Sequence, residues 1–485
     1  MLHPAWHIVV AAATLVLAGG CACAVRRLPP GVSYTGTPAP APQVRFLHDL
    51  TYVDSAGQRR SEQEIFDEAF ALVRGARRFV LVDLFLYNTF SGHSHEQLRP
   101  LCEELTAALI ERKRQVPDMC IVVITDPINT AYGGRPAPHL DALRAAGIPV
   151  VMTDLDRLRD ALPLYSVFWR IFVGPFGDDD GRGGWLPSPF GEGKVGLRSW
   201  LRLLNLKANH RKVVIADRDG EMLGLVTSAN PHDASSAHGN VAAVFDGAAV
   251  LDLFNSEKAV LAFSGGPLIE WPFDPAPPAD DPGGHAGAAA PPTAQVLTEG
   301  RIKAAILDDL RQAAAGDSID LVMFYLADRD VIAELKAAHA RGAVLRVLLD
   351  PNKDAFGRTK NGIPNRQVAN ELHRRGIAVR WSDTHGEQAH AKMLLVRRAD
   401  GRCSLNLGSA NLTRRNLDDL NLETNVCIRG RAADRVFADA KAYVDLLWNN
   451  AADRHFSVDY SAYAEDSTWR TVRYRIMEAT GLSSF

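Results

Sequence analysis

The sequence predicts an α/β fold made of two tandem copies of one α/β/α unit. Continuous apolar segments alternate with amphipathic helical segments, the same order of segments occurs twice, and a stretch rich in Pro, Gly and Ala separates the two occurrences. Continuous apolar strands that alternate with helices indicate mostly parallel sheets covered on both faces. The 485 residues are long enough for two such units of roughly 200 residues each.

The first copy contains a helical segment at 64–74 followed by an apolar strand at 79–87. An amphipathic helix then leads to a buried strand at 120–127 that ends in Asp-Pro. A further helix leads to a strand that begins with Gly-Ile-x-Val at 147–150. These periodicities define three strand–helix steps.

The second copy repeats these steps in the same order. A helix at 301–314 precedes a strand at 319–326, the strand at 345–351 again ends in Asp-Pro, and Gly-Ile-x-Val recurs at 376–379. The repetition predicts an internal duplication.

The composition of the chain places the boundaries of these units. The stretch at 272–293 is rich in Pro, Gly and Ala and lacks hydrophobic periodicity, so we interpret it as a linker. We assign 44–271 to a first lobe and 294–485 to a second lobe.

The N-terminal residues 1–25 predict a signal or a membrane anchor. The run 8–25 is apolar or small, and no charged residue precedes Arg26. It could end in cleavage at Ala-Cys-Ala (22–24), in lipidation at Cys21 or in an uncleaved, cytoplasm-facing anchor. We expect a membrane-associated protein of a bacterial cell envelope, with export or lipidation favoured.

Charge and cysteine content exclude several classes of protein. The formal net charge is -3, from 54 basic and 57 acidic residues, so the chain lacks the general positive charge of a protein that coats nucleic acid. Six cysteines without a CxxC pair exclude a disulfide scaffold and a zinc ribbon. We expect the last four, at 102, 120, 403 and 427, to be buried thiols.

Each copy ends in a polar signature on a strand–turn–strand segment. The residues of these signatures are His210, Lys212, Asp217, Ser228 and Asn230 in the first copy and His390, Lys392, Ser409, Asn411 and Glu423 in the second. Alternation along a strand places the His and the Lys of each signature on one face. A neutral imidazole beside an ammonium, with Ser and Asn donors, can hold a phosphate and attack its phosphorus. Two matching copies predict one phosphodiester site.

These motifs resemble the phospholipase D superfamily, whose signature is HxKxxxxD followed by GSxN, present twice. The resemblance covers about 44–447, and the HRK, HAK and GSANL forms look most like bacterial phospholipid-acting members such as cardiolipin synthases. The last position of the HxKxxxxD signature is Asp217 in the first copy. The equivalent position in the second copy is Arg397, so the second motif is incomplete. The resemblance implies a bilobal monomer whose two HxK motifs meet across a pseudo-twofold axis at the lobe interface. It also implies one phosphohistidine, one histidine that protonates the leaving alcohol, and no metal or other cofactor.

The two copies differ at the position that orients the histidine. The resemblance places the orienting carboxylate at Glu423, and alignment of the copies places Asn240 at the equivalent position. A carboxylate stabilises an imidazolium better than an amide does. We therefore expect His390, backed by Glu423, to be the general acid and His210 to be the nucleophile.

An aromatic insertion at 162–204 has no counterpart in the second copy. Its aromatic residues are Tyr165, Phe168, Trp169, Phe172, Phe176, Trp185, Phe190 and Trp200. Aromatic residues mixed with Arg and Lys suit a bilayer surface or an acyl-chain entrance, and a packed lid is the alternative. We take Trp169 and Phe172 as candidates for substrate binding.

A basic loop at 350–369 follows the end of a strand, where α/β sheets usually bind ligands. Its basic residues are Lys353, Arg358, Lys360 and Arg366. They could steer an anionic headgroup or simply be solvated, and we take Lys353 and Arg366 as candidates.

The sequence therefore predicts an enzyme that hydrolyses phospholipids or transfers phosphatidyl groups at a membrane surface. A nuclease of the same superfamily is the second hypothesis, although the net charge and the apolar N-terminus favour a lipid and no nucleic acid partner. An inactive membrane-tethered scaffold is the third, motivated by the incomplete second motif.

Overall fold

The computed structural model describes residues 27–485 except 91, 93–95, 97, 177–183, 192, 274–289, 356–357, 452 and 484–485. The predicted signal or anchor at 1–25 and most of the predicted linker at 272–293 lie outside the described residues. Within the described part of the chain, no helix combines the length and the hydropathy needed to cross a bilayer.

The first lobe is built on an eight-stranded sheet over the described residues, in the order β3-β2-β11-β10-β9-β4-β5-β6. Its elements are β2 (Arg45–Val53), β3 (Arg59–Gln63), α2 (Ile65–Gly75), β4 (Phe79–Leu84), α3 (Leu101–Gln115), β5 (Cys120–Thr125), α4 (Pro138–Ala145), β6 (Val150–Met152), α5 (Pro163–Phe172), β7 (Leu186–Pro187), β8 (Lys194–Val195), α6 (Leu197–Leu203), β9 (Lys212–Arg218), β10 (Glu221–Thr227), β11 (Asn240–Phe245) and α7 (Ala248–Phe263). The small hairpin β7–β8 and the helices α5 and α6 belong to the insertion.

The second lobe is built on a nine-stranded sheet over the described residues, in the order β1-β12-β20-β19-β18-β13-β14-β17-β21. Its elements are β1 (Ala39–Pro40), β12 (Thr293–Thr298), α8 (Gly300–Arg311), β13 (Ser318–Met323), α9 (Arg329–Ala340), β14 (Val344–Leu349), β15 (Asp354–Ala355), β16 (Arg358–Thr359), α10 (Asn365–His373), β17 (Ala378–Ser382), β18 (Lys392–Arg397), β19 (Arg402–Gly408), α11 (Arg414–Leu417), β20 (Thr424–Arg431), α12 (Arg435–Asn449), β21 (Ser457–Asp459) and α13 (Thr468–Thr480). Strand β1 comes from the N-terminal segment and pairs with β12.

The predicted duplication is visible in the strand order. The run β2-β11-β10-β9-β4-β5-β6 of the first sheet corresponds to β12-β20-β19-β18-β13-β14-β17 of the second. The expectation of mostly parallel sheets is wrong, because only β4-β5-β6 and β13-β14-β17 pair in parallel and the other neighbours are antiparallel. Continuous apolar strands report burial on both faces, and here a second sheet provides part of that burial.

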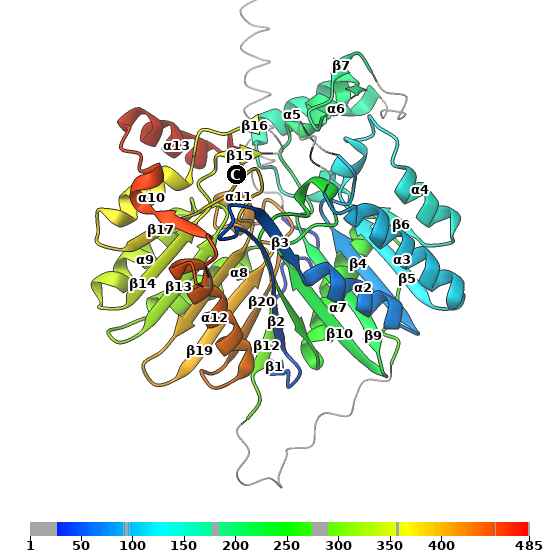
Figure 1. The fold of residues 1–485 in the computed structure, drawn as a ribbon. Helices are drawn as coiled ribbons and strands as arrows, with labels where there is room; N and C mark the ends of the chain where they lie inside the picture. Colours follow the sequence, from blue (N-terminus) through cyan, green and yellow to red (C-terminus); the bar gives the residue numbers. More distant parts are fainter. Residues whose placement is uncertain are drawn as a thin grey trace, which may run out of the picture.

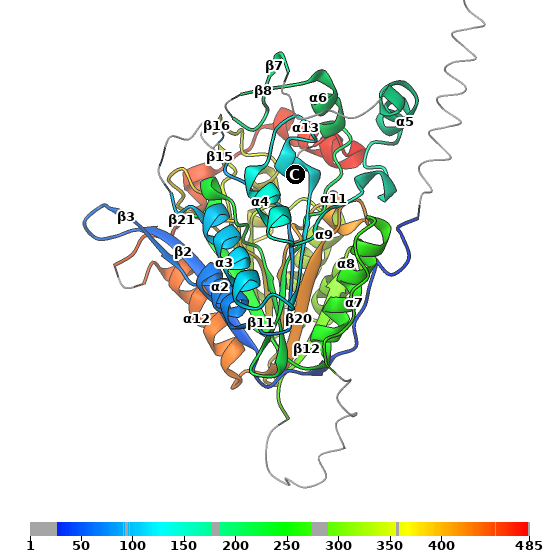
Figure 2. The same cartoon turned by 90° about the vertical axis from the view of Figure 1, so that its right-hand side faces the viewer.

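The two sheets pack against each other in the middle of the molecule (Figure 1). One apolar cluster joins inner-face residues of both sheets, such as Val213 and Ile215 on β9 and Leu405 and Leu407 on β19, with residues of α7 and α12. Separate clusters lie under α2, α3 and α4 on the outer face of the first sheet and under α8, α9 and α10 on that of the second. Figure 2 shows α2, α3 and α4 in front of the first sheet, on its outer face. The α/β two-lobe architecture is confirmed.

Three of the four described cysteines are buried thiols, at Cys102, Cys403 and Cys427. The prediction is wrong for Cys120, which is exposed at the first position of β5. Side chains alternate between the faces of a strand, but the first residue of a strand can lie beyond the covering helices.

Candidate active site

The two HxK motifs meet at one cavity between the lobes. His210 precedes β9 and His390 precedes β18, so both lie at the same end of the paired sheets. The cavity has a volume of about 250 Å³. The lining residues include His210, Asn230, Phe85, Leu86 and Ala208 from the first lobe and His390, Asn411, Phe324, Tyr325, Ala355, Lys360, Gln388, Arg415, Asn416 and Asn421 from the second.

The aspartates of the two Asp-Pro sequences position the histidine segments. Asp126 follows β5, and its Oδ2 accepts the backbone N–H of Asn209 at 2.7 Å. Asp350 follows β14, and its Oδ2 accepts the backbone N–H of Ala389 at 2.8 Å. Each buried carboxylate therefore fixes the residue immediately before a histidine, which explains why Asp-Pro occurs in both copies.

Each histidine is also held by the backbone of the opposite lobe. The N–H of His210 donates to the carbonyl oxygen of Leu422 at 2.9 Å, and the N–H of His390 donates to that of Gly239 at 2.8 Å. Correct placement of either imidazole therefore depends on the docking of both lobes.

The Nδ1 atoms of the histidines have partners that cross the interface. His210 Nδ1 lies 2.9 Å from Oε2 of Glu423, and His390 Nδ1 lies 3.1 Å from Oδ1 of Asn240. The expected pairing of Glu423 with His390 and of Asn240 with His210 is therefore wrong, because the docked lobes exchange these partners. Both partners present an oxygen acceptor, so each Nδ1 carries a proton and each Nε2 is left for the cavity.

The two serines position these partners and do not reach the cavity. Ser409 Oγ donates to Oε2 of Glu423 at 2.5 Å, and Ser228 Oγ donates to Oδ1 of Asn240 at 2.9 Å. Both serines are fully buried. Their expected role as direct phosphate donors is not supported by this geometry, whereas Asn230 and Asn411 do line the cavity.

A lysine and a phenylalanine make equivalent contacts around each of the two histidines. Lys212 Nζ and Lys392 Nζ each donate, at 2.7 Å, to the backbone carbonyl oxygen of the histidine in the same motif. Phe85 and Phe324 lie with ring centroids 4.7 and 4.9 Å from the imidazole of their own lobe. The lysine Nζ atoms lie 5.0 and 5.1 Å from the centroids of these rings.

Burial sets the ionisation of the site. It lowers the pKa of His210 to about 4 and that of Lys212 to about 7, although Glu423 raises both. Burial and the charge of Lys392 hold the pKa of His390 well below its usual value. Burial would raise the pKa of Glu423, but His210, Lys212 and Ser409 keep it below the usual value. The imidazoles are therefore neutral at pH 7, and a bound phosphate anion would raise the pKa of each cationic group.

Arg415 adds a cation at the wall of the cavity. Among the described residues its Nη2 is buried without a hydrogen-bond partner, and burial lowers its pKa to about 10. A buried guanidinium that lacks a carboxylate partner favours an anionic ligand.

Comparisons with known proteins agree with this arrangement. Residues 306–448 match the family model described as "Cardiolipin synthase, PLD-like domain". The phosphatidylserine synthase of Haemophilus influenzae Rd KW20 has a TM-score of 0.55 and 12% sequence identity, over 92% of this chain and 96% of that chain. The resemblance to the phospholipase D superfamily is confirmed. At this identity the solved structure shows a shared fold.

Two further solved structures have lower TM-scores. The polyphosphate kinase of Porphyromonas gingivalis has a TM-score of 0.47 and 12% identity, over 91% of this chain and 53% of that chain. Nuc from Salmonella typhimurium, a phospholipase D family member, has a TM-score of 0.28 and 20% identity, over 34% of this chain and 97% of that chain. No curated protein sequence matches the chain.

The last position of the phospholipase D-like HxKxxxxD motif lies away from the cavity. Asp217 Oδ1 accepts the backbone N–H groups of Arg78 and Phe79, both at 2.8 Å, where β4 begins. Asp217 lies near the far end of β9 from His210, so its expected catalytic role is replaced by a structural one. At the equivalent position Arg397 contacts Asp320 at 3.3 Å, which explains how the second motif can be incomplete without loss of site residues.

The two aromatic candidates of the insertion differ in exposure. Trp169 is buried in the insertion, and the guanidinium of Arg198 lies 5.1 Å from its ring centroid, so it cannot contact a substrate. Phe172 is 57% exposed on the surface of α5 and lies outside the cavity. Helical periodicity does not separate the two, which are three residues apart, but Phe172 is the last residue of α5 whereas Trp169 lies inside the helix against Arg198.

The two basic candidates are also turned away from the cavity between the lobes. Lys353 Nζ donates to the hydroxyl of Tyr463 at 2.9 Å, and the Arg366 guanidinium lies 5.1 Å from the same ring. Lys360 of the same loop lines the cavity and contacts the hydroxyl of Tyr325. Loop charge alone did not indicate which cation faces the site.

Sequence reasoning also missed Phe85, Phe324, Arg415 and the asparagines at 416 and 421. The two phenylalanines follow the duplicated strands β4 and β13 at matching positions, so alignment of the copies could have found them. No local pattern distinguishes Arg415. The described residues contain no group of three or more His, Cys, Asp or Glu side chains able to hold a metal ion.

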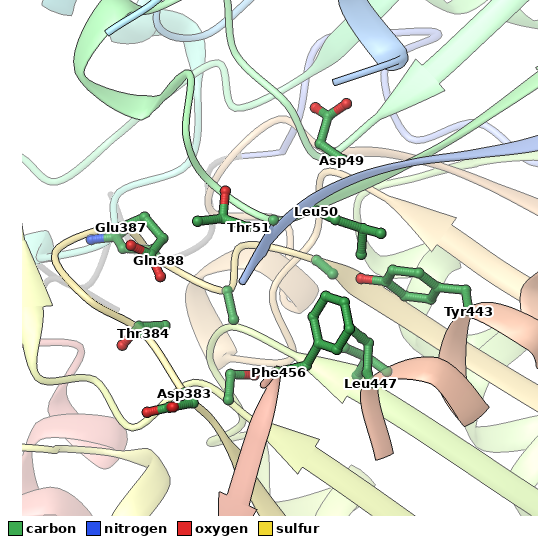
Figure 3. Close-up of a pocket in the computed structure, with 15 residues that line it drawn as sticks. Asp49, Leu50, Thr51, Asp383, Thr384, Glu387, Gln388, Tyr443, Leu447 and Phe456 are labelled. Carbon is green, nitrogen blue, oxygen red and sulfur yellow. The ribbon is translucent and has the colours of Figure 1, made fainter. Parts of the chain in front are cut away.

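A second, much smaller cavity of about 40 Å³ lies on the other side of the segment that carries His390. Its wall includes Ala389 and Ala391, which flank that histidine. Figure 3 shows Asp49 on one side and Tyr443 and Phe456 on another. This cavity is too small for a phospholipid headgroup, so the larger cavity is the candidate substrate site.

Proposed function

We propose that the protein is a membrane-associated phosphodiesterase or phosphatidyltransferase that acts on phospholipids through a phosphohistidine intermediate. The observation that supports this most directly is the pair of buried imidazoles at one cavity, each with Nδ1 fixed from the opposite lobe. The family match to a cardiolipin synthase domain and the fold shared with a phosphatidylserine synthase support a phospholipid substrate.

The crossed pairing supports His210 as the nucleophile for a reason different from the one expected. Its Nε2 would attack phosphorus, and positive charge would develop on the ring as the P–N bond forms. Glu423, 2.9 Å from Nδ1, stabilises that charge. The carboxylate lies beside His210 and not beside His390 as expected from the sequence, but the assignment of the nucleophile is retained.

His390 would then be the general acid. The charge of a bound phosphodiester raises the pKa of His390, so the ring would take up a proton on Nε2 when the substrate binds. As the P–O bond to the leaving alcohol breaks, this proton would pass from Nε2 to the alkoxide oxygen. Asn240 orients the ring without holding the proton as tightly as a carboxylate would. In the second step water or another alcohol would give a proton to His390 and attack phosphorus, which breaks the P–N bond and restores His210.

Two exposed apolar surfaces support membrane association. They flank the cavity end of the molecule, where the insertion lies on one side and α13 on the other (Figure 1). The exposed apolar residues are Leu164, Phe168, Ile171 and Phe172 on α5, Phe176 and Trp185 in the insertion, and Trp469, Val472 and Ile476 on α13. Helix α13 also carries the exposed basic residues Arg470, Arg473 and Arg475, which suit an anionic lipid surface.

The function is tested with purified protein and phosphatidylglycerol vesicles, with and without added alcohol, beside single-stranded DNA. Cardiolipin formation would support transfer, and release of phosphatidic acid would support hydrolysis. Cleavage of DNA without lipid turnover would contradict the proposal and favour a nuclease, and absence of all three would favour an inactive scaffold.

The mechanism is tested by acid quenching during turnover of a phosphorus-labelled lipid. We expect the label on the peptide that contains His210. Label on the His390 peptide would contradict the assignment, and substantial activity of His210→Asn would contradict the two-histidine scheme.

A further inference from the structure

An apolar pocket adjoins the catalytic cavity on the side of the first lobe. It has a volume of about 290 Å³ and shares three lining residues, Phe85, Leu86 and Ala355, with the catalytic cavity. Phe90, Ile128 and Phe190 extend the wall away from the histidines. A ligand that occupies both spaces would pass the ring of Phe85, which lies against His210.

The pocket is closed by the insertion. The rings of Phe90 and Phe190 stack with centroids 5.9 Å apart. Next to Phe190, a Cβ on Gly191 would lie 2.6 Å from the carbonyl oxygen of Gly92, and the φ of Gly191 is +120°. Glycine therefore allows the insertion to pack against the segment after β4, and this contact completes the apolar wall.

Two of the three polar side chains that line this pocket, His232 and Asn88, already have partners. His232 Nδ1 lies 2.8 Å from Ser235 Oγ, and its Nε2 lies 2.6 Å from the carbonyl oxygen of Phe90. Asn88 Nδ2 donates to Asn129 at 2.6 Å. The third, Arg358, is exposed on β16, so the pocket itself offers mainly hydrocarbon contacts to a ligand.

The second lobe contributes cationic and polar side chains to the catalytic cavity. Lys360, Gln388 and Arg415 line it from the second lobe, next to His390. A phosphodiester bound between the histidines would thus have an apolar wall on one side and a cationic, polar wall on the other. This asymmetry matches a phospholipid, which has a hydrocarbon ester on one side of phosphorus and a polar headgroup on the other.

We propose that the apolar pocket binds an acyl chain of the phosphatidyl group while the headgroup lies against Lys360 and Arg415. The inference rests on the proposed function. In an in-line displacement the leaving alcohol lies opposite the nucleophile, on the side of His390, and the retained ester oxygen lies off this axis, toward Phe85. The anchored chain holds the phosphatidyl group in place while one alcohol leaves and another enters.

In the first experiment the substitution Ile128→Trp places a larger side chain in the apolar pocket and reduces its volume. Turnover of dioleoyl phosphatidylglycerol in mixed micelles is compared with hydrolysis of bis-p-nitrophenyl phosphate, which has no acyl chain. Since each buried methylene contributes roughly fourfold to affinity, we expect kcat/KM for the lipid to fall at least about tenfold while that for the chain-free diester changes less than about twofold. Val344→Trp, at an exposed residue at the start of β14, is the control for an added Trp. An equal fall for both substrates, or no change for either, would overturn the inference.

The second experiment does not depend on turnover. His210→Asn protein is irradiated with phosphatidylglycerol that carries a diazirine in one acyl chain, and the labelled peptides are identified. Label on peptides that contain Ile128 or Phe190 supports the pocket, and label confined to other peptides overturns it. Pocket labelling without lipid turnover by the wild type would contradict the proposed function alone, whereas lipid turnover with labelling elsewhere would contradict this inference alone.

Discussion

At the residue scale, the crossed partners make the two imidazoles chemically different although their surroundings are otherwise symmetric. His210 faces an ionised carboxylate and His390 faces an amide. A carboxylate partner makes an imidazole a better base and nucleophile, whereas an amide partner makes the imidazolium a better acid. The two copies differ at one orienting position, which is Glu423 in the second copy and Asn240 in the first. This difference is sufficient to make His210 the nucleophile and His390 the general acid.

This difference predicts opposite shifts of the pH profile of kcat/KM. The charge of Glu423 raises the pKa of His210, so Glu423→Gln lowers that pKa below about 4 and moves the profile to lower pH. Asn240→Asp places a carboxylate beside His390, which raises its pKa and moves the profile to higher pH. We also expect Glu423→Gln to lower kcat roughly a hundredfold, because the charge on the phosphohistidine loses its partner.

The profiles are measured with the chain-free diester, so that lipid binding does not contribute. A control is Glu62→Gln, at a surface carboxylate that pairs with Arg454 far from the histidines in sequence, and it should leave the profile unchanged. Shifts of both site variants in the same direction would contradict the assigned pairs.

The crossing itself could not be predicted from the sequence. The motif residues and the duplication were predicted because they are local patterns, and the structure brings His210 and His390 to one cavity. Which oxygen reaches which imidazole depends on how two sheets dock, and no local pattern encodes that. The inner positions of Ser228 and Ser409 have a different cause, because each hydroxyl bonds to Asn240 or Glu423 of its own lobe and the motif does not show which way the hydroxyl points.

At the element scale, the insertion and α13 form one continuous end of the molecule although they belong to different lobes. Gly481 ends α13 with φ +73°, and a Cβ there would lie 3.2 Å from the carbonyl oxygen of Ala161, just before α5. The exposed apolar residues of α13 at 469, 472 and 476 recur at helical spacing, as on a helix that lies in a bilayer interface. The aromatic content of the insertion could be recognised in the sequence. The three apolar residues of α13 are too few to indicate a surface in the sequence, and their significance follows from their place beside the insertion in the structure.

These two elements predict the vesicle-binding behaviour of surface variants. Phe172→Ser on α5 and Trp469→Ser on α13 each remove an exposed apolar side chain, and we expect each to weaken binding to anionic vesicles several-fold and the double variant to weaken it further. Vesicle co-sedimentation is the measurement, with protein that lacks residues 1–25 so that the predicted anchor does not dominate.

Val344→Ser is the matched control for this prediction. Val344 is 64% exposed, but it begins β14, whose other end leads to Asp350 at the site, so it lies at the opposite end of the sheet. Equal binding by all variants would show that the two exposed surfaces do not contact lipid.

At the scale of the whole molecule, a buried ion cluster connects the lobes behind the site. Arg211 lies between the His and the Lys of the first motif, and its side chain is fully buried. Its guanidinium pairs with Glu257 of α7 at 3.0 Å and with Glu299 of the second lobe at 2.8 Å. Glu299 also accepts the backbone N–H of Glu423 at 3.1 Å. The middle residue of the HxK motif thus links lobe docking to the residue that orients His210.

This cluster predicts a large and pH-dependent loss of stability in Arg211→Met. Removal of one member of a buried ion pair typically costs about 3–5 kcal/mol, because the remaining charge has no partner.

The pH dependence of this loss follows from Glu299. Burial already raises the pKa of Glu299 to about 7, and loss of the Arg211 charge raises it further. A carboxyl group whose pKa is higher in the folded than in the unfolded protein stabilises the fold at low pH, and this stabilisation is lost as the pH rises through the folded pKa. The destabilisation measured by urea unfolding should therefore be larger at pH 9 than at pH 6. Arg218→Met, at the end of β9, removes a partly exposed pair with Glu68 of α2 and should cost less than about 1 kcal/mol at both pH values. Equal losses for the two variants, or a loss for Arg211→Met that shrinks as the pH rises, would show that the buried cluster does not hold the lobes together.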